Sequence, residues 1–340
     1  MTTSVSVIIV NYRTAALAIE AIESVLARRH GGRQIDVHVV DNGSPGDDAA
    51  ILTEAGAVRN WGTRVTLHLE SLNHGFGRGN NVALEALAAS PAPPDYVFLL
   101  NPDARLDNEA IDILATALDG NPAIGIAGGA LYNPDGSQAA SAFRFPGIAS
   151  EFSGAACLGP VSRLLRGAQV PLPPVSAPQP VDWVTGAAFL ARFALLRDLR
   201  FFDPDFFLYF EETELMRRVG RAGQAVWHLP EARIIHAAGA ATGMVNSRVA
   251  EKPQPGYWYD SWRLYHVKAN GRTHARIAAL AHLVGSGLNA VVQPLRGKPA
   301  NRPRGYFRDF TAHVLRPLFL GNPLQTGPEL PNPEHRRQPG

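Results

Sequence analysis

Apolar runs alternate with helical patterns over the first hundred residues of the chain. Residues 5–10 (VSVIIV) form a run that is β-branched except for Ser6, which is typical of a strand buried on both faces of a parallel sheet. Residues 17–26 then place apolar side chains at helical spacing. Further strands are predicted at 35–40, 65–69 and 96–100, and a further helix through 82–89. This alternation predicts an α/β fold, with an open, mostly parallel, Rossmann-like sheet flanked by helices and joined by right-handed crossovers.

Polar clusters follow each of the predicted strands. In an open α/β sheet, the ligand site lies beyond the carboxyl ends of the strands. Function is therefore expected in four places: Asn11 to Arg13, Asp41 with Asn42, Asn73 to Asn81, and Asn101 to Asp103.

The remainder of the chain divides by composition. Five prolines between Pro171 and Pro180 indicate an exposed loop, and an acidic helix is predicted after Phe210. Beyond about residue 240 the pattern becomes helical and basic, with 13 Lys and Arg against 4 Asp and Glu from residue 252 onward. We therefore predict a catalytic domain over 1–240, a helical C-terminal extension over 241–322 and a disordered tail over 323–340.

Composition and charge limit the partners. A chain with 46% hydrophobic and 18% charged residues is typical of a folded protein, and a single cysteine, Cys157, excludes an internal disulfide framework. No secretory signal is visible at the N-terminus, so we expect a cytoplasmic protein. The basic C-terminal quarter suggests an anionic lipid surface or a diphosphate-linked substrate rather than a nucleic acid, although a solvated basic tail would look the same.

Two strand ends carry candidate ligands for a nucleotide and a metal. Asp103 follows a buried strand and is a candidate ligand for Mg²⁺ or Mn²⁺, and Asn101 offers an amide oxygen to the metal or to a ribose. Asp41 ends another strand and could accept an N–H from a pyrimidine, while Tyr12 could stack on a base. Turn and cap roles would explain the same side chains equally simply.

A glycine-rich segment runs from Asn73 to Asn81. Backbone N–H groups that lead into a helix N-terminus can bind phosphate, and Gly75 and Gly77 would allow that approach. The segment is not a dinucleotide fingerprint, because Asn80 stands where its third glycine would be and the segment follows the third strand rather than the first.

The acidic run Tyr209 to Glu214 carries the candidate base. Aromatic residues precede it, and partial burial with mutual repulsion would raise the pKa of a carboxyl group toward that of a general base. A solvated first helical turn is the alternative interpretation. His236, after another apolar stretch, is a candidate metal ligand or a buried core histidine.

These segments in this order resemble family 2 glycosyltransferases of the GT-A fold, and within that family the rhamnosyltransferase-like members. The resemblance covers about residues 4 to 240 and rests on VSVIIVNY, VVDNGS, NHGFGRGNN, LLNPDA, Trp183 to Ala187, FFLYFEETELMRR and IIH ending at His236. It implies an inverting, metal-dependent enzyme of the hexosyltransferase type.

The resemblance also implies roles for single residues. Asn11, Tyr12, Asp41, Gly75, Gly77, Asn80 and Asn101 would line the nucleotide site, Asp103 and His236 would bind the metal, Glu212 would be the base, and Trp183, Gly186, Glu214 and Arg218 would line the sugar and acceptor pocket. The chain has Glu-Glu-x-Glu where the family has Glu-Asp-x-Asp, so Glu211 remains an alternative base.

The implied reaction moves a sugar from dTDP-rhamnose or a UDP-sugar to a glycan or lipid-linked acceptor of a bacterial surface polysaccharide. Two other functions stay open: a catalytically degenerate homologue that serves as a binding subunit, and a sugar-nucleotide nucleotidyltransferase. The latter is disfavoured because the first strand is followed by Asn11 to Thr14 rather than by a glycine-rich basic loop.

The stretch from 277 to 295 contains no Asp, Glu, Lys or Arg. That length approaches the ~20 residues of a membrane-spanning helix, but several polar residues within it disfavour spanning. A peripheral contact with the inner face of the plasma membrane and an ordinary packed helix are both compatible with it.

Overall fold

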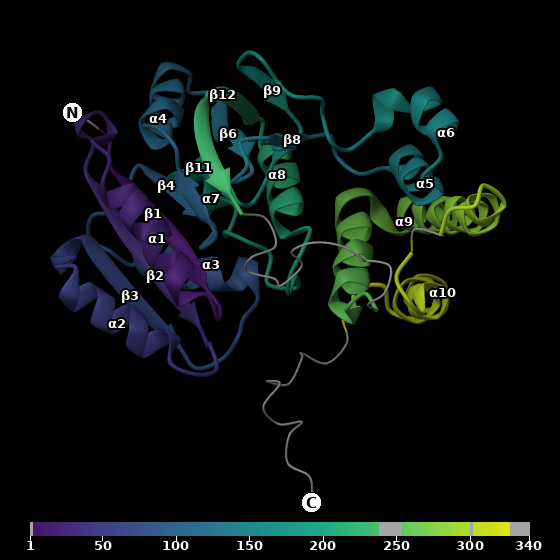
Figure 1. Ribbon diagram of the computed structural model, residues 1–340, viewed down its shortest axis with the longest axis horizontal. Helices are drawn as coiled ribbons and strands as arrows, with labels where there is room; N and C mark the ends of the chain where they lie inside the picture. Colours follow the sequence, from purple (N-terminus) through teal and green to yellow (C-terminus); the bar gives the residue numbers. More distant parts are fainter. Residues whose placement is uncertain (1–2, 238–252, 300–301, 327–340) are drawn as a thin grey trace, which may run out of the picture.

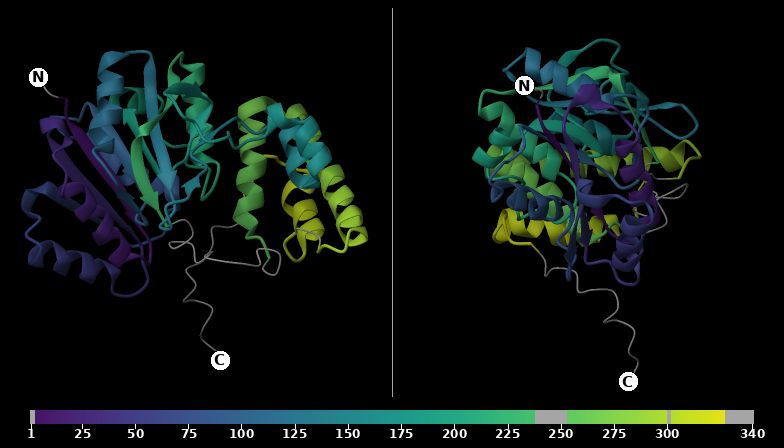
Figure 2. Two further views of the ribbon diagram at one scale, coloured as in Figure 1. Left: turned by 45° about the horizontal axis from the view of Figure 1, so that its top comes forward. Right: turned by 90° about the vertical axis from the view of Figure 1, so that its left-hand side faces the viewer.

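The computed structural model describes residues 3–237, 253–299 and 302–326. It has two parts that lie side by side, a sheet-based part and a mainly helical part (Figures 1 and 2). The strands are β1 (Val5–Asn11), β2 (Ile35–Asn42), β3 (Val65–Glu70), β4 (Tyr96–Leu100), β5 (Ala104–Leu106), β6 (Ile124–Tyr132), β7 (Gln138–Ala139), β8 (Ala142–Phe143), β9 (Gln179–Val181), β10 (Trp183–Val184), β11 (Ala188–Arg192) and β12 (Ala225–His236).

Helices cover the sheet and form the second part. They are α1 (Ala15–Leu26), α2 (Asp48–Val58), α3 (Phe76–Ala88), α4 (Ala110–Gly120), α5 (Ile148–Ala156), α6 (Gly159–Leu164), α7 (Phe193–Asp198), α8 (Glu211–Arg221), α9 (Gly256–Leu295), α10 (Tyr306–Phe310) and α11 (Arg316–Leu320). A π-helical turn, η4 (Thr311–Leu315), joins the last two, and short 3₁₀ turns lie at His30–Gly32, Gly62–Arg64 and Arg166–Ala168.

The main sheet has the strand order β3-β2-β1-β4-β11-β6-β12-β5. Strands β3, β2, β1 and β4 are parallel, as expected from their buried β-branched sequences. Beyond β4 the sheet is mixed, because β11 pairs antiparallel with both β4 and β6. The GT-A-like arrangement places the carboxyl ends of β2, β1 and β4 at one edge.

Each face of the sheet has its own core. Val7 and Ile9 of β1 belong to the core that contains α1 and α4, whereas Ile8 and Val10 belong to the core that contains α3, α7 and α8. Alternate side chains of a strand point to opposite faces, so a strand covered on both sides must be apolar throughout. This is why residues 5–10 are apolar except for Ser6, whose buried hydroxyl donates to Asp36 Oδ1 at 2.7 Å.

The helical part centres on α9, which is broken at Gly271, where φ is 84° and ψ is 165°. Helix α5, from the middle of the chain, packs against α9: a Cβ at Gly285 would lie 2.4 Å from the carbonyl oxygen of Phe152. Asn289 Nδ2 donates to the carbonyl oxygen of Ala156 at 2.9 Å. A helical C-terminal region is therefore present as expected, and helix α5, which comes before residue 240 in the sequence, packs against it.

A buried ionic cluster holds α5 against α9. The Glu151 carboxylate accepts hydrogen bonds from Trp262 Nε1 at 3.0 Å, His266 Nε2 at 3.2 Å and His282 Nδ1 at 2.6 Å. Burial alone would raise the pKa of Glu151, but the hydrogen bonds and charges of the two histidines outweigh burial and lower it. The predicted tail beyond residue 326 lies outside the described residues.

Candidate active site

The ends of β1 and β2 form a buried polar cluster. Asn11 pairs with Asp41 in the sheet, and its Nδ2 donates to Asp41 Oδ1 at 2.8 Å and to Asp48 Oδ1 at 3.2 Å. Ser44 Oγ donates to Asp41 Oδ1 at 2.6 Å. Asn11 and Asp41 are both buried, and Tyr12 beside them is half-buried. Asn11 thus orients the carboxylate of Asp41 at the sheet edge.

Asn42 organises the glycine-rich loop next to this cluster. Its Nδ2 donates to Asn73 Oδ1 at 3.1 Å and to the carbonyl oxygen of Gly75 at 2.9 Å, and its Oδ1 accepts from the N–H of His74 at 3.1 Å. The loop leads directly into α3, and Asn80 lies at the start of its second turn; that side chain is buried and donates to the carbonyl oxygen of Phe76 at 2.9 Å.

The glycine loop is joined to the segment before α8. Phe76 N–H donates to the carbonyl oxygen of Phe207 at 3.0 Å. Gly75 has φ +80°, and a Cβ there would lie 1.9 Å from the same carbonyl oxygen. A Cβ at Gly77 would lie 3.4 Å from the Cβ of Glu211. Gly75 requires glycine, because its φ is positive and a Cβ would collide with the carbonyl oxygen of Phe207, whereas at Gly77 the neighbouring side chains are only in close contact.

Asp103 and His236 meet at the next strand end. His236 Nε2 lies 3.1 Å from Asp103 Oδ1, and their side chains are 14% and 2% exposed. The backbone N–H of Ala237 donates to the carbonyl oxygen of Asp103 at 3.0 Å. Pairing of β12 with β5 brings His236 opposite Ala104, so the sheet itself brings together residues 133 positions apart.

These side chains fit part of a divalent-metal site. Asn101 Oδ1 is buried and has no hydrogen-bond partner among the described residues. Among the residues that the structure describes, no group of three or more His, Cys, Asp and Glu side chains is arranged to hold a metal ion. Mg²⁺ in nucleotide enzymes is commonly bound by one or two carboxylates together with substrate phosphates and waters, so a partial set of protein ligands fits this chemistry.

The acidic helix α8 begins after two strained residues. Tyr209 and Phe210 both have positive φ, 74° and 69°, which is rare for side chains of this size. Such strain is retained only where the surroundings enforce it, and it is common at functional sites. It places Glu211 and Glu212 in the first turn of the helix, where negative charge is favoured by the helix dipole.

The two glutamates have different surroundings. Glu211 is 2% exposed and its Oε2 has no hydrogen-bond partner among the described residues. Burial, and then the charge of Glu212, raise the pKa of Glu211 well above its ordinary value. Burial also raises the pKa of Glu212, against the lowering effect of backbone N–H groups that include Gly186.

Gly186 brings Glu212 to the loop of Asn101. A Cβ at Gly186 would lie 3.4 Å from the Cγ and Cδ of Glu212, so the carboxyl group lies against the Gly186 backbone. The next residue, Ala187, accepts a hydrogen bond from the N–H of Asn101 at 2.8 Å. The acidic helix, the glycine loop and the loop of Asn101 and Asp103 therefore surround one region of the molecule.

Three predicted pocket residues make contacts within the protein. Arg218 Nε donates to both carboxylate oxygens of Glu214 at 2.9 Å, and its other nitrogens donate to the carbonyl oxygens of Leu199 and Phe201. Positions two apart on a helix point to nearly opposite sides, so Glu214 does not share the surroundings of Glu212. Trp183 stacks on Phe143 with ring centroids 4.1 Å apart and is half-buried.

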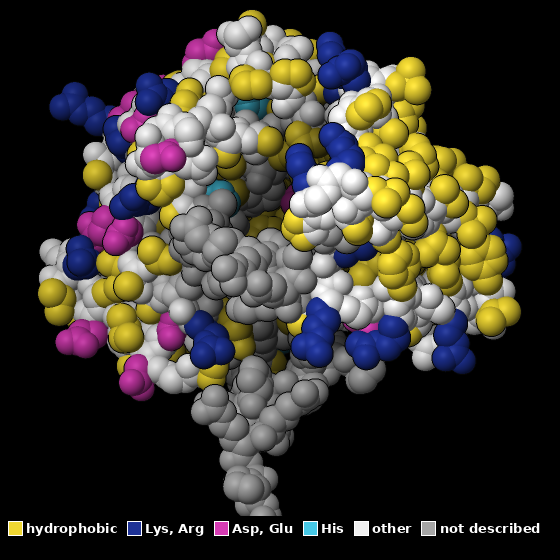
Figure 3. Space-filling view, turned by 45° about the vertical axis from the view of Figure 1, so that its right-hand side comes forward, with side chains coloured by type: hydrophobic (Ala, Val, Ile, Leu, Met, Phe, Trp, Pro, Cys, Tyr) yellow, Lys and Arg dark blue, Asp and Glu magenta, His cyan; other side chains and the backbone are white. Residues whose placement is uncertain are grey.

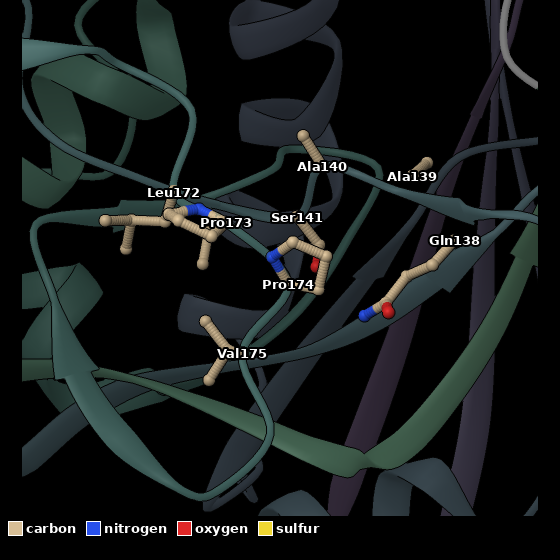
Figure 4. A pocket seen from close by; sticks show the side chains of 9 residues that line it. Gln138, Ala139, Ala140, Ser141, Leu172, Pro173, Pro174 and Val175 are labelled. Atoms are coloured by element: carbon tan, nitrogen blue, oxygen red, sulfur yellow. The ribbon is translucent and has the colours of Figure 1, made fainter. Parts of the chain in front are cut away.

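A separate cavity is lined by none of these carboxylates. It has a volume of about 140 Å³ and is lined by residues of two extended segments, with Ser141, Leu172, Pro173 and Val175 among them (Figure 4). Sites for drug-sized ligands typically occupy about 300–1,000 Å³, so this cavity is too small for a nucleotide sugar.

Contacts with α9 were not anticipated from the sequence. Lys268 Nζ pairs with Asp203 at 2.6 Å and Asp205 at 2.5 Å, and Ser261 Oγ donates to the carbonyl oxygen of Leu208 at 2.9 Å. These bonds hold the segment that leads into α8. The two aspartates are close to the acidic run, but no local pattern connects them with a lysine 63 to 65 positions later.

Comparisons with known proteins agree with this arrangement. A family model described as glycosyl transferase family 2 matches residues 6–152. N-acetylglucosaminyl-diphospho-decaprenol L-rhamnosyltransferase of Mycobacterium tuberculosis is 30% identical over 223 residues, which are 62% of this chain and 69% of the relative. Rhamnosyltransferase WbbL of Escherichia coli K12 is 25% identical over 169 residues, 48% of this chain and 61% of the relative.

Solved structures show the same fold. A mannosyltransferase from Pyrobaculum calidifontis, solved with GDP-Man and Mn²⁺, superposes with a TM-score of 0.54 at 15% identity, and the match covers 95% of this chain and 82% of that one. Together with the family model and the mycobacterial relative, this shows that the chain belongs to glycosyltransferase family 2 and is a glycosyltransferase of the GT-A fold.

Proposed function

We propose that the protein transfers a sugar, with rhamnose from dTDP-rhamnose favoured over a UDP-sugar, to a lipid-linked or glycan acceptor of a bacterial surface polysaccharide. The relatives named above support the sugar and the type of acceptor, since both are rhamnosyltransferases and one is named for a diphospho-decaprenol substrate. The reaction proposed is a single displacement with inversion at the anomeric carbon.

The observation that carries the proposal is the position of Glu212. Its carboxyl group lies against Gly186, next to the loop of Asn101 and Asp103, and the residue is half-buried. We assign to it the removal of the acceptor hydroxyl proton. The acceptor oxygen forms the new bond to the anomeric carbon as the bond to the diphosphate oxygen breaks, and the proton is left on Glu212.

The nucleotide is proposed to lie along the edge formed by β1, β2 and β4. Asp41, oriented by Asn11, would accept an N–H of the pyrimidine, with Tyr12 beside the base. Gly75, Gly77 and Asn80 would line the pocket where the glycine loop enters α3. Asn101 would offer its amide oxygen, which has no partner in the described part of the chain, to the ribose or the metal site.

A divalent cation is proposed at Asp103 and His236. Two of the structural neighbours were solved with Mn²⁺, which supports metal use in this fold. When bound, Mg²⁺ or Mn²⁺ would supply positive charge to the diphosphate leaving group. Asp103 and His236 would hold it, and His236 would be neutral to do so.

A thermal-shift panel tests the donor assignment. The full chain would be melted with dTDP-rhamnose, UDP-glucose, UDP-N-acetylglucosamine, UDP-galactose and GDP-mannose, each with and without Mn²⁺. We expect dTDP-rhamnose with Mn²⁺ to stabilise the protein most, because a ligand that binds only the folded state raises its stability. Failure of every nucleotide sugar to stabilise the protein would contradict the proposal.

The same proposal places the protein in the cytoplasm, in peripheral contact with the inner face of the plasma membrane. Nucleotide sugars are water-soluble, whereas a lipid-linked acceptor is confined to a bilayer, so the enzyme has to work at the boundary between them.

A further inference from the structure

One helix face of the protein exposes apolar side chains to solvent in an unbroken row. The C-terminal segment of α9, after the break at Gly271, carries side chains at steps of three and four that are between 36% and 81% exposed. We call this row the α9 stripe, and it consists of Ile277, Leu280, Val284, Leu288, Val291 and Leu295. No charged residue interrupts it from 277 to 295, a length of about 27 Å at 1.5 Å per helical residue.

The opposite face of the same segment is small and polar, and it is buried. Gly285, Ser286, Asn289 and Gln293 face the protein interior, beside the buried Ala278 and Ala279. Asn289 Nδ2 and Gln293 Nε2 donate to the carbonyl oxygens of Ala156 and Cys157, at 2.9 Å and 3.1 Å, where α5 ends. The terminal carbonyl groups of α5, which the helix itself cannot pair, thus find donors on α9.

This orientation is the reverse of what water favours. A helix on a protein that meets only water turns its apolar face inward and its polar face outward. Here hydrogen bonds, the close approach at Gly285 and the Glu151 cluster hold the polar face inward. A contiguous exposed apolar surface of this kind marks a site of contact with a protein or a membrane.

Basic residues surround the stripe. From 272 to 322 the chain has eight Lys and Arg and a single acidic residue, Asp309. Arg272 and Arg276 stand at one end of the stripe, and Arg296 and Lys298 at the other. Figure 3 shows hydrophobic side chains gathered over the right-hand part of this face, with Lys and Arg around them. Among neighbouring elements, Leu164 of α6 and Phe307 of α10 are also exposed.

The charge decides between a bilayer and a second copy of the chain. Two copies that meet through this face would bring like charges together, which costs free energy. An anionic bilayer instead attracts each nearby Lys or Arg and accepts the apolar side chains among its acyl chains. By length and composition α9 could cross a membrane, but its polar face is hydrogen-bonded to α5, and this favours a helix that lies on the membrane surface.

We call the residues at the two ends of the stripe, Arg272, Arg276, Arg296 and Lys298, its basic margin. We propose that the α9 stripe and its basic margin dock the protein on the surface of an anionic bilayer, with the helix parallel to the membrane. The inference deepens the proposed function, on which it rests for the need to reach a lipid-linked acceptor. Figure 3 supports it, because the hollow between the two parts of the molecule opens on the same face as the apolar patch.

Vesicle sedimentation of the full chain tests the docking surface without any sugar. Vesicles of phosphatidylglycerol with phosphatidylcholine are compared with pure phosphatidylcholine. The variant Leu280→Gln, Val284→Gln, Leu288→Gln should bind the anionic vesicles at least about tenfold more weakly than the parent, because three apolar side chains are lost from the contact. The matched control Ile51→Gln, Val58→Gln, Leu69→Gln changes exposed apolar residues of the sheet-based part and should bind as the parent does.

The basic margin has its own variant. Arg296→Gln with Lys298→Gln should weaken binding to the anionic vesicles and leave the weak binding to phosphatidylcholine unchanged. Failure of the parent to bind anionic vesicles, or equal binding by the stripe variant, would overturn the proposal. A third outcome would also overturn it: the parent forms a stable dimer in light scattering and does not bind vesicles, and the stripe variant does not form the dimer. A second copy of the chain would then cover the stripe.

Transfer assays separate this inference from the proposed function. The stripe variant should lose transfer to a lipid-linked acceptor in vesicles but keep transfer to a short, water-soluble acceptor. If the parent binds vesicles and neither acceptor is used, the docking surface stands and the proposed function is wrong.

Discussion

At the scale of single residues, the two adjacent glutamates at the start of α8 have different surroundings. Burial raises the pKa of both Glu211 and Glu212, and the charge of Glu212 adds to the effect on Glu211. Glu212 is the one that lies against the Gly186 backbone. Glu211 lies beside Gly77 with one carboxyl oxygen unpartnered among the described residues, so it is better placed to remain a neutral acid.

Replacing Glu212 tests the assignment of the base. We expect Glu212→Gln to lower kcat by about 10²–10⁴-fold, the usual contribution of a general base, while donor binding in a thermal-shift assay stays near that of the parent. Glu211→Gln should keep most of the activity, and Glu54→Gln, on an exposed helix position, is the control. Loss in Glu211→Gln with activity retained in Glu212→Gln would reverse the assignment.

The pH dependence of transfer follows from the same carboxyl group. A general base must be ionised, so kcat/KM should be low at acidic pH and rise as the pH passes through the pKa of Glu212. Because burial raises that pKa, the midpoint should lie above the ordinary value of a glutamic acid. Initial rates in buffers of constant ionic strength measure it, and a midpoint at or below the ordinary value would contradict the assignment of Glu212 as the base.

At the scale of elements, the glycine loop and the segment before α8 form one unit. They meet where the carbonyl oxygen of Phe207 accepts a hydrogen bond from Phe76 N–H. The same oxygen occupies the space that a Cβ at Gly75 would need. The strained backbone of Tyr209 and Phe210 lies just beyond this contact. A change in the loop that would bind the nucleotide should therefore be felt at the residues that begin α8.

Gly75→Ala tests this coupling. The new Cβ would meet the Phe207 carbonyl oxygen and require a positive φ, so the two loops should separate, with a rise in the KM for the donor and a fall in kcat. Gly136→Ala is the matched control, since Gly136 has φ +83° and no neighbour within 4 Å of its Cβ position. If both variants change activity equally, the effect comes from backbone strain alone and not from the contact.

At the scale of the whole molecule, the helical part supports the catalytic part. Lys268 of α9 pairs with Asp203 and Asp205, and Ser261 holds the carbonyl oxygen of Leu208. Arg217 of α8 donates to Asn270 Oδ1 at 2.6 Å. The segment from 203 to 210 is therefore held from outside the sheet, by the same helix whose far end carries the α9 stripe.

Lys268→Met tests this support. The side chain keeps its length but loses both ion pairs, so hydrogen exchange in residues 203–210 should become faster and kcat should fall several-fold, with little change in the donor KM. Arg272→Met, one turn further along α9 and bonded to the carbonyl oxygens of Leu318 and Gly321, is the control. Unchanged exchange in 203–210 would show that the ion pairs do not hold the segment.

Much of the sheet could be predicted from the sequence because its signals are local. The mainly apolar sequence of β1 and the polar residues at the strand ends follow from burial on both faces and from the position of ligand sites in α/β sheets. The order of motifs also identified the family, and the acidic helix begins where expected, at Glu211. The roles of the single residues in that site remain predictions.

Tertiary structure decided what no local pattern contains. The antiparallel insertion of β11, the meeting of Asp103 with His236 and the reach of Lys268 to Asp203 each join residues far apart in the chain. The composition of residues 277–295 determined that this segment of α9 carries no charge, but not which of its faces packs against the rest of the protein. That was decided by the carbonyl groups at the end of α5, because buried polar groups must find hydrogen-bond partners and the polar face of α9 supplies them.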